Sequence, residues 1–287
     1  MITLRLPLAL PPHSKDPTLY AIGLWNFAQI YTTFESLWQA LRCNVAFHGR
    51  SSNMHDFLSN LLPKGLERSE RLHRDLLALD ESIPNGPKPV RLRRTLSKTD
   101  EFKQHICNAV VRKPHVLVAY AWIMYMAIFS GGRWIRAELL SAGENFWTSK
   151  VNHDGSMSDI GKERTEENKS VLRQLPGLLF LSFDGVDDGE SIKATFKKRF
   201  LTAEHIFSAE EREDILEEAR TIFGFNIAMV EELDVVVMSM KEKSINGRQV
   251  EGTLFAVTEY VRQILLILME PQIYISLVFI IAILIVW

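Results

Sequence analysis

Cysteine is scarce in this sequence, and the motifs that mark many metal and nucleotide sites are absent. Two cysteines, Cys43 and Cys107, among 287 residues exclude a disulfide-stabilised scaffold and are typical of a reducing compartment. Neither cysteine belongs to a CxxC pair or a zinc-spaced set, and no Walker-type loop occurs. These absences exclude zinc fingers and P-loop nucleotide-binding proteins.

An excess of charge of one sign is also lacking. The formal net charge is −2, which gives no sign of a nucleic-acid partner. Alternating polar and apolar runs joined by hairpin turns are missing too. Residues 177–183, GLLFLSF, form the one candidate strand, and a single strand makes no sheet. The sequence therefore predicts an all-α protein.

Apolar residues recur at helical spacing along most of the chain. The predicted helices cover residues 18–43, 52–79 with a break at 63–65, 99–113, 114–140, 191–207 and 208–243. Thr99 and Asp100 are predicted to cap the helix that follows them, and Ser208 and Glu211 form a capping box. Proline and glycine predict a loop at 82–94, and polar composition predicts an exposed insertion at 149–170.

Ser130, Gly131 and Gly132 interrupt the helix predicted for residues 114–140. Glycine inside a helix costs about 1 kcal/mol relative to alanine, so its presence needs a reason. One reading is a loop between two helices. The other is a kinked helix whose face, free of side chains, lets a flat ligand approach the backbone. The local sequence leaves both readings open.

The C-terminal residues 274–287 carry no charge, and residues 264–273 extend this apolar run except at 270–272. A membrane-spanning helix needs about 20 apolar residues, so the run is somewhat short. A buried core helix is the alternative. We expect a C-terminal membrane anchor because the segment has no polar face to turn toward water. The predicted organisation is a helical domain at 1–245, a linker and juxtamembrane segment at 246–271, and an anchor at 272–287.

Three segments, taken in order, resemble the heme oxygenase family. Residues 114–140 resemble that family's distal helix with its Ser-Gly-Gly kink, and residues 30–38, IYTTFESLW, resemble its first full helix. Residues 180–233 resemble its later helix pair, which ends in Asn-Ile and Glu-Glu-Leu. The resemblance spans residues 19–237. It implies a heme oxygenase-like helical bundle, and the C-terminal transmembrane tail helix fits the membrane-bound members.

The resemblance also implies roles for individual residues. In the family the kinked helix lies over one heme face, so Ser130, Gly131 and Gly132 are expected to bring backbone close to bound dioxygen and to steer the reaction. Lys193 and Lys197 match basic residues that meet the heme propionates. A solvated basic face is the alternative for both lysines.

Further matched residues are aromatic or polar. Tyr31, Trp122 and Phe223 match aromatic residues that line the heme pocket, with ordinary core packing as the alternative for each; for Trp122 and Phe223 the two readings are equally good. Glu35 and Asn226 also match. For Asn226 a structural hydrogen bond is the expected role, because a buried amide needs partners.

Two positions depart from the family pattern. Ile128 stands where the family carries an aspartate that organises water for proton delivery. The family's iron-ligating histidine belongs to a helix that, by spacing, falls at or ahead of Met1. His13 lies in a proline-rich turn after that place and is at best a weak candidate ligand for iron. We therefore expect residues 1–287 to bind heme poorly and to turn over little.

The sequence supports two functions. The first is a heme oxygenase that cleaves heme to biliverdin, iron and carbon monoxide, with electrons from an NADPH-dependent cytochrome reductase. Such a protein is expected to be tail-anchored in the endoplasmic reticulum or a related membrane, with its main domain facing the cytosol. The second is a related protein that binds heme or another flat apolar ligand without turnover. A di-iron oxidase is disfavoured because residues 115–129 contain no carboxylate.

Overall fold

The computed structural model describes residues 6–43, 52–82, 96–147, 175 and 177–245. The chain divides into two compact units. One comprises residues 7–233 and carries every predicted site residue. The other comprises residues 1–6 and 234–287, of which the structure describes Leu6 and the end of one helix. The predicted loop at 82–94, the polar insertion and the membrane anchor lie almost wholly outside the described residues.

The described residues form helices joined by turns, and none of them forms a strand, so the all-α prediction is confirmed. In chain order, the elements are η1 Leu6–Ala9, α2 Thr18–Arg42, α3 Ser52–Leu61, α4 Ser69–Ser82, α6 Ser97–Arg112, η2 Pro114–Val116, α7 Leu117–Tyr120, η3 Ala121–Tyr125, η4 Ile128–Gly132, α8 Arg133–Ser141, α9 Glu144–Trp147, α11 Glu190–Phe200, η5 Leu201–His205 and α12 Ala209–Ile245. Residues 177–183, the candidate strand, are turns and bends.

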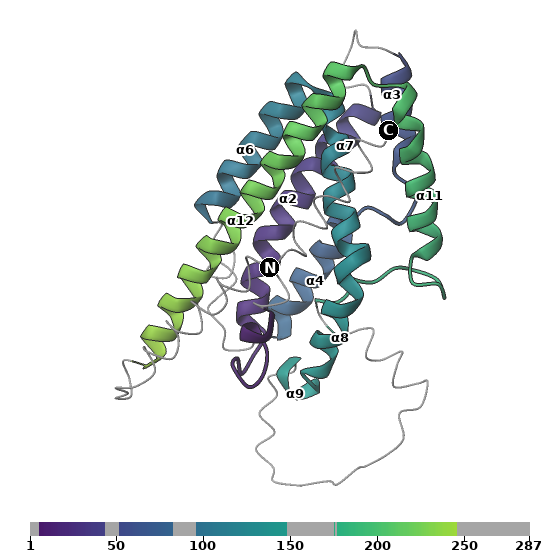
Figure 1. The fold of residues 1–287 in the computed structure, drawn as a ribbon. Helices are drawn as coiled ribbons and strands as arrows, with labels where there is room; N and C mark the ends of the chain where they lie inside the picture. The colour runs from purple at the N-terminus through teal and green to yellow at the C-terminus, as the bar shows by residue number, and fades with distance from the viewer. Residues whose placement is uncertain (1–5, 44–51, 83–95, 148–174, 176, 246–287) are drawn as a thin grey trace, which may run out of the picture. The chain divides into compact units, whose positions relative to one another are not determined.

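Helix α2 is the centre of the 7–233 unit and contacts α3, α4, α6 and α7. Its buried face includes Ile30, Phe34 and Trp38, none of which is exposed to solvent. Figure 1 shows α6 on one side of α2 and α7, and α11 on the opposite side. The helical periodicity of residues 18–43 therefore predicted this helix correctly, and most sides of the helix are buried.

The start of α6 corrects one sequence prediction. The helix begins at Ser97, before the predicted Thr99–Asp100 cap, and no side chain of its own caps it. Instead the carboxylate of Glu232 on α12 accepts bonds from the backbone N–H groups of Ser97 (2.9 Å) and Lys98 (2.8 Å). A carboxylate at a helix N-terminus satisfies orphan donors and complements the helix dipole. Because Glu232 lies far away in sequence, a local search for caps missed it.

The predicted capping box of α12 is confirmed. The Ser208 hydroxyl accepts a bond from the Glu211 backbone N–H (3.1 Å), and the Glu211 carboxylate accepts one from the Ser208 N–H (2.9 Å). Both partners lie within four residues of each other, so the sequence contained all the information that this cap requires.

Helix α4 holds the irregular residues 177–182 in place through two buried charges. The Asp75 carboxylate accepts bonds from the backbone N–H groups of Gly177, Leu179 and Phe180, at 2.7–3.1 Å. The guanidinium of Arg68, just before α4, donates to the carbonyls of Phe180 (3.3 Å) and Ser182 (2.9 Å). A segment without regular structure thereby satisfies its backbone inside the protein.

Candidate functional site: the glycine-bearing helix and helix α11

Ser130, Gly131 and Gly132 lie inside a continuous helical run from Pro114 to Ser141, so the loop reading is wrong. Two stretches of the run are π-helical, Ala121–Tyr125 and Ile128–Gly132, and the second contains all three residues. A π turn is wider than an α turn and is frequent at functional sites. The glycines therefore mark a change in helix type rather than an end of the helix.

The two glycines meet different surroundings. Gly132 is buried, and a Cβ atom built on it would lie 3.2 Å from Ile128 Cγ2 and 3.6 Å from Leu181 Cδ2. Gly131 is half-buried, and a Cβ atom there would meet only Ile135 Cδ1, at 3.9 Å. Gly132 thus allows close packing inside the protein, whereas the backbone at Gly131 is uncovered enough for a ligand to approach it. Ser130, beside it, is exposed.

Ile128 is buried, and its side chain lies against Gly132. The position that carries an aspartate in the resembled family is therefore filled by an aliphatic group packed within the protein. A hydrocarbon offers no hydrogen bond to order water. The absence of a water-ordering role for Ile128 stays a prediction, and the burial of its side chain is consistent with it.

The first π turn places two tyrosines five residues apart against one ring of α2. Tyr120 and Tyr125 both contact Phe34, with ring centroids 5.9 Å and 5.7 Å apart. In an α-helix, side chains four residues apart lie above one another, and a π turn widens that spacing to five. Tyr31 adds a hydrogen bond from its hydroxyl to the Met124 carbonyl (2.8 Å).

Tyr31 was predicted to line a ligand pocket, and the structure places it in the core. Its ring contacts those of Phe34, Tyr125 and Phe180, and its side chain is almost completely buried. Burial, with the nearby charge of Glu35, raises the pKa of the hydroxyl well above its usual value. The neutral hydroxyl therefore donates to the helix backbone. This structural role agrees with core packing, the alternative that the sequence left open for Tyr31.

Glu35 is a buried carboxylate that joins α2, α4 and the first π turn. It accepts bonds from the backbone N–H groups of Arg68 and Ser69 (2.8 Å each), from the Ser69 hydroxyl and from the Tyr125 hydroxyl (2.8 Å). Burial raises the pKa of Glu35, and these hydrogen bonds oppose the rise. Glu35 therefore caps α4 and anchors Tyr125 at the same time.

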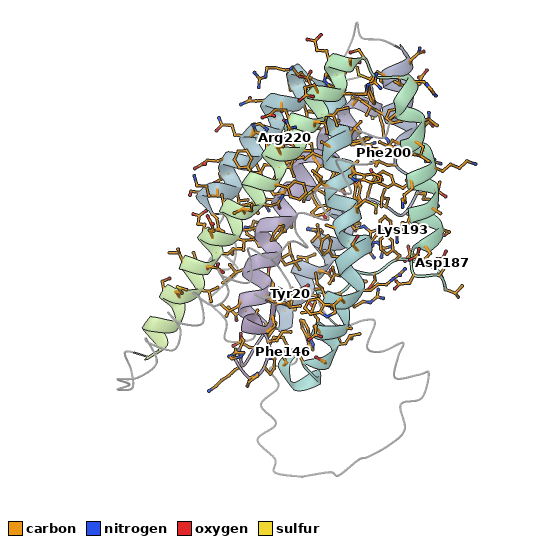
Figure 2. All side chains as sticks on the ribbon, viewed as in Figure 1. Tyr20, Phe146, Asp187, Lys193, Phe200 and Arg220 are labelled. Atoms are coloured by element: carbon orange, nitrogen blue, oxygen red, sulfur yellow. The ribbon has the colours of Figure 1, made fainter. Side chains whose placement is uncertain are left out.

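Trp122 connects the glycine-bearing helix to α11. Its ring lies 4.4 Å from that of Phe200 and 6.1 Å from that of Phe196, measured between centroids. Phe196 is fully buried, while Trp122 and Phe200 are partly exposed. Figure 2 labels Phe200 and Lys193 on the same helix, α11. The aromatic contact brings the helix with the predicted propionate lysines beside the helix with the open glycine.

The two lysines differ in their surroundings. The ammonium of Lys193 lies 3.7 Å from the Glu190 carboxylate and is partly covered. Lys197, one turn later on the same face, is exposed and pairs with no carboxylate in the described parts of the chain. Lys197 is thus the lysine whose charge is available to an anionic ligand.

The remaining predicted residues lie apart from this pair of helices. Phe223 is half-buried on α12 and has no ring contact with other described residues, whereas its neighbour Phe225 stacks on Phe102 of α6 at 4.7 Å. Asn226 donates to the Ile222 carbonyl (2.8 Å), which confirms the expected structural hydrogen bond. His13 is exposed in the turn before α2.

Comparison with known proteins now decides the family. The sequence model of heme oxygenase matches residues 25–232, most of the chain. The chain belongs to the heme oxygenase family. The match covers both the glycine-bearing helix and α11, as the sequence motifs indicated. A comparison with curated proteins finds no match.

Solved heme oxygenases share the fold at low sequence identity. Heme oxygenase 2 from Chlamydomonas reinhardtii, solved without heme, is 18% identical, with a TM-score of 0.57 over 80% of this chain and 87% of its own. Heme oxygenase-1 from Synechocystis, in complex with heme, is also 18% identical, with a TM-score of 0.52 over 80% and 83%. Heme oxygenase-2 from Synechocystis, with heme and NO, is 16% identical, with a TM-score of 0.52 over 77% and 74%. These relatives establish the heme oxygenase fold of this member.

Sequence reasoning missed Arg68 and Asp75. Both are fully buried, yet each side chain is charged and stands in a polar part of the sequence. Burial is the main cause that lowers the pKa of Arg68 to about 10 and raises that of Asp75 to about 6. The partners of Asp75, and two of the carbonyls that Arg68 binds, lie more than 100 residues away, so no local pattern in the sequence of this family member signals these contacts.

Proposed function

We propose that this protein binds heme against the open face at Ser130 and Gly131, with Lys197 of α11 meeting a propionate. The observation that carries the proposal is the half-exposed stretch of helix at Gly131, where a Cβ atom would meet only Ile135 Cδ1, at 3.9 Å, among the described residues. A flat macrocycle can approach helix backbone closely only where side chains are absent. Membership of the heme oxygenase family supports this choice of ligand.

The chemistry we propose is that of the family: oxidative cleavage of heme to biliverdin, ferrous iron and carbon monoxide. Heme is then both substrate and cofactor, and an NADPH-dependent cytochrome reductase supplies the electrons. Bound heme provides the iron at which oxygen is activated. The chain's own contribution is to hold the macrocycle, to leave room for a small ligand at Gly131, and to fix the propionates through charge.

Among the described residues, no histidine is well placed to act as the axial ligand of heme iron. Three histidine rings are already engaged: Nε2 of His55 with the Leu41 carbonyl (3.0 Å), of His105 with Glu218 (2.8 Å), and of His115 with Asp214 (3.0 Å). His13 is exposed in a turn. Because heme proteins hold their iron through an axial side chain, these histidines give no support for a proximal ligand.

A second function, binding of heme without turnover, is favoured by Ile128. Its buried aliphatic side chain replaces the group expected to order water for proton delivery. The same open face at Gly131 serves binding in both functions. The two therefore differ only in whether oxygen is activated.

The site of action is part of the proposal. We infer that residues 272–287 anchor the protein in the endoplasmic reticulum or a related membrane, with the helical domain in the cytosol. The charge-free run in the sequence supports this. In the described parts of the chain, one helical run, Pro114–Ser141, is long and apolar enough to span a membrane, but 67% of its apolar window is buried inside the protein, as in a core helix.

Heme titration of the full-length chain in detergent tests binding, with the Soret absorbance as the readout. Lys197→Glu should weaken binding by about 1–3 kcal/mol, the range for hydrogen bonds to charged groups. Lys198→Glu is the matched control because Lys198 is also exposed on α11 and changes the same charge. Heme with esterified propionates should reduce the difference between the two variants. Equal losses in both variants would overturn the propionate role.

Turnover separates the two functions. The heme-loaded chain is supplied with reductase, NADPH and oxygen, and biliverdin is measured with and without added imidazole. Biliverdin without imidazole supports the oxygenase and shows that the chain contributes its own iron ligand. A Soret shift with imidazole but no biliverdin supports binding without turnover. No Soret change at any heme concentration would refute both.

A further inference from the structure

The turn before α11, residues 180–190, is fastened to the glycine-bearing helix. The Phe183 ring stacks on that of Phe129 at 4.8 Å with an interplanar angle of 8°. The Arg68 guanidinium lies 4.3 Å from the Phe183 centroid, and Leu181 lies against Gly132. The turn is thus packed directly on the second π turn.

Two arginines that follow the glycines add ion pairs to the same turn. Arg136 donates to Asp188 through both terminal guanidinium nitrogens, with Nη1 3.0 Å from Oδ1 and Nη2 hydrogen-bonded to Oδ2. Arg133 Nε lies 3.3 Å from Asp188 Oδ2, and Arg133 Nη2 lies 2.6 Å from Glu190 Oε1. We call Arg133, Arg136 and Asp188 the clamp.

The electrostatics indicate that the clamp is more than an exposed ion pair. Single exposed pairs contribute little to stability, but forked arginine–carboxylate contacts are stronger and directional. Burial alone would raise the pKa of Asp188, yet the hydrogen bond from Arg136 and the charges of Arg136 and Arg133 hold it below its usual value. The Asp188 side chain is 29% exposed and that of Arg136 is 21% exposed.

The backbone conformation of the turn is one that needs stabilising contacts from neighbouring side chains. Asp188 has φ 46° and Gly189 has φ 84°, two consecutive left-handed residues. A Cβ atom on Gly189 would lie 2.5 Å from Phe183 Cγ, so only glycine fits there. A left-handed residue other than glycine persists where surrounding contacts hold it. Asp187 then caps α11, accepting bonds from the Gly189 (3.2 Å) and Ser191 (2.9 Å) N–H groups.

We propose that the clamp sets the position of α11, and with it Lys193 and Lys197, relative to the open backbone at Gly131. The Trp122 contact ties the second half of α11, and the clamp ties its beginning. Arg133, Arg136 and Asp188 are therefore positioning residues: they act on a ligand through α11 without touching it. Their effect on heme rests on the proposed function, whereas their effect on α11 does not.

The key variant is Asp188→Asn, because asparagine tolerates a left-handed backbone and lacks the charge. Asp184→Asn is the matched control: Asp184 lies in the same turn, but its carboxylate pairs with Arg71, just inside α4, at 2.6 Å. Spin labels at Ala137 of α8 and Ala194 of α11, both exposed, report the distance between the two helices by pulsed electron resonance. Cys43 and Cys107 are replaced by serine in all samples.

Asp188→Asn should broaden or shift the distance distribution, while Asp184→Asn should leave it unchanged. Heme affinity should fall roughly tenfold in Asp188→Asn and stay within about twofold of the parent in Asp184→Asn, a difference of one order in the dissociation constant. Arg136→Gln combined with Asp188→Asn should have a smaller effect than the sum of the two single changes, because each single change removes the Arg136–Asp188 contact. Asp188→Gly repeats the test without backbone strain if Asp188→Asn does not fold.

The outcomes separate the two proposals. An unchanged distance distribution in both Asp188 variants would overturn the clamp, whatever heme does. A changed distribution in a protein whose parent binds no heme would overturn the proposed function and support the clamp as the device that places α11. A changed distribution with unchanged heme affinity would overturn the link between the position of α11 and the ligand.

Discussion

Gly131 offers a prediction in which stability and ligand binding move in opposite directions. A methyl group at this position would meet a single atom, Ile135 Cδ1, at 3.9 Å, an ordinary van der Waals distance. Alanine is a better helix residue than glycine by roughly 0.5–1 kcal/mol, because glycine loses more conformational freedom on folding. Gly131→Ala should therefore stabilise the folded protein by about this amount. The expected rise in Tm is about 2 °C for a protein of this size.

The ligand should respond in the opposite sense. Bulk at Gly131 occupies the space that a flat macrocycle needs, so Gly131→Ala should weaken heme binding and Gly131→Leu should abolish it. Gly224→Ala is the matched control, since Gly224 lies on helix α12 and its Cβ position has no atom within 4 Å. It should give a similar gain in stability and no change in heme affinity. Gly132→Leu is a poor test because Gly132 packs against Ile128 and Leu181.

The assays are urea unfolding followed by circular dichroism and heme titration followed by the Soret band. Lower stability in Gly131→Ala would show that Gly131 does not have the open, helical surroundings described above. Unchanged heme affinity in Gly131→Leu would show that the open face is not the ligand site. Either result refutes the reasoning at a different step, the first on structure and the second on function.

Two further predictions concern pH and the membrane. Burial raises the pKa of Asp75 to about 6, although the backbone donors of Phe180, Leu179 and Gly177 oppose the rise. An unfolded aspartate ionises near pH 4, so the unfolded chain releases its proton first, and this residue costs the fold stability as pH rises from about 4 to about 6, by at most roughly 3 kcal/mol. Urea unfolding across this range should show the loss in the parent and a flatter profile in Asp75→Asn; parallel profiles would contradict the assignment. Deleting residues 270–287 should move the protein from the membrane to the soluble fraction after a salt wash, and a truncated chain that still pellets would disprove the anchor.

Local sequence was a good guide wherever the decisive partners were near in sequence. The apolar spacing predicted a helix over 18–43, and α2 covers Thr18–Arg42. Pro63 and Gly65 predicted a break, which separates α3 from α4. The ordered motifs also pointed to the heme oxygenase family, which the match over residues 25–232 confirms. Periodicity and short turns are set by neighbouring residues, so one sequence suffices to show them.

The sequence predicted which helices form the candidate site, but it did not predict which residues face a ligand and which pack in the core. Ser-Gly-Gly marked the right helix, but the sequence treats Gly131 and Gly132 alike, and the packing of Ile128 and Leu181 around Gly132 separates them. Tyr31 was predicted to contact a ligand because an aromatic residue on a helix gives the same sequence pattern whether it faces a ligand or the core. The hydrogen bond to Met124, a residue 93 positions away, shows which face it occupies.

The sequence by itself determined that the chain is helical, that its helices break where proline and glycine stand, and that it resembles heme oxygenases. Tertiary structure decided which groups the charged side chains meet: Glu232 caps α6, the buried Glu35 caps α4, and Asp188 meets two arginines after the glycines. The physical reason is that a charge taken wholly or partly out of water requires partners at hydrogen-bond distance, and the folded backbone, not sequence proximity, brings those partners within reach.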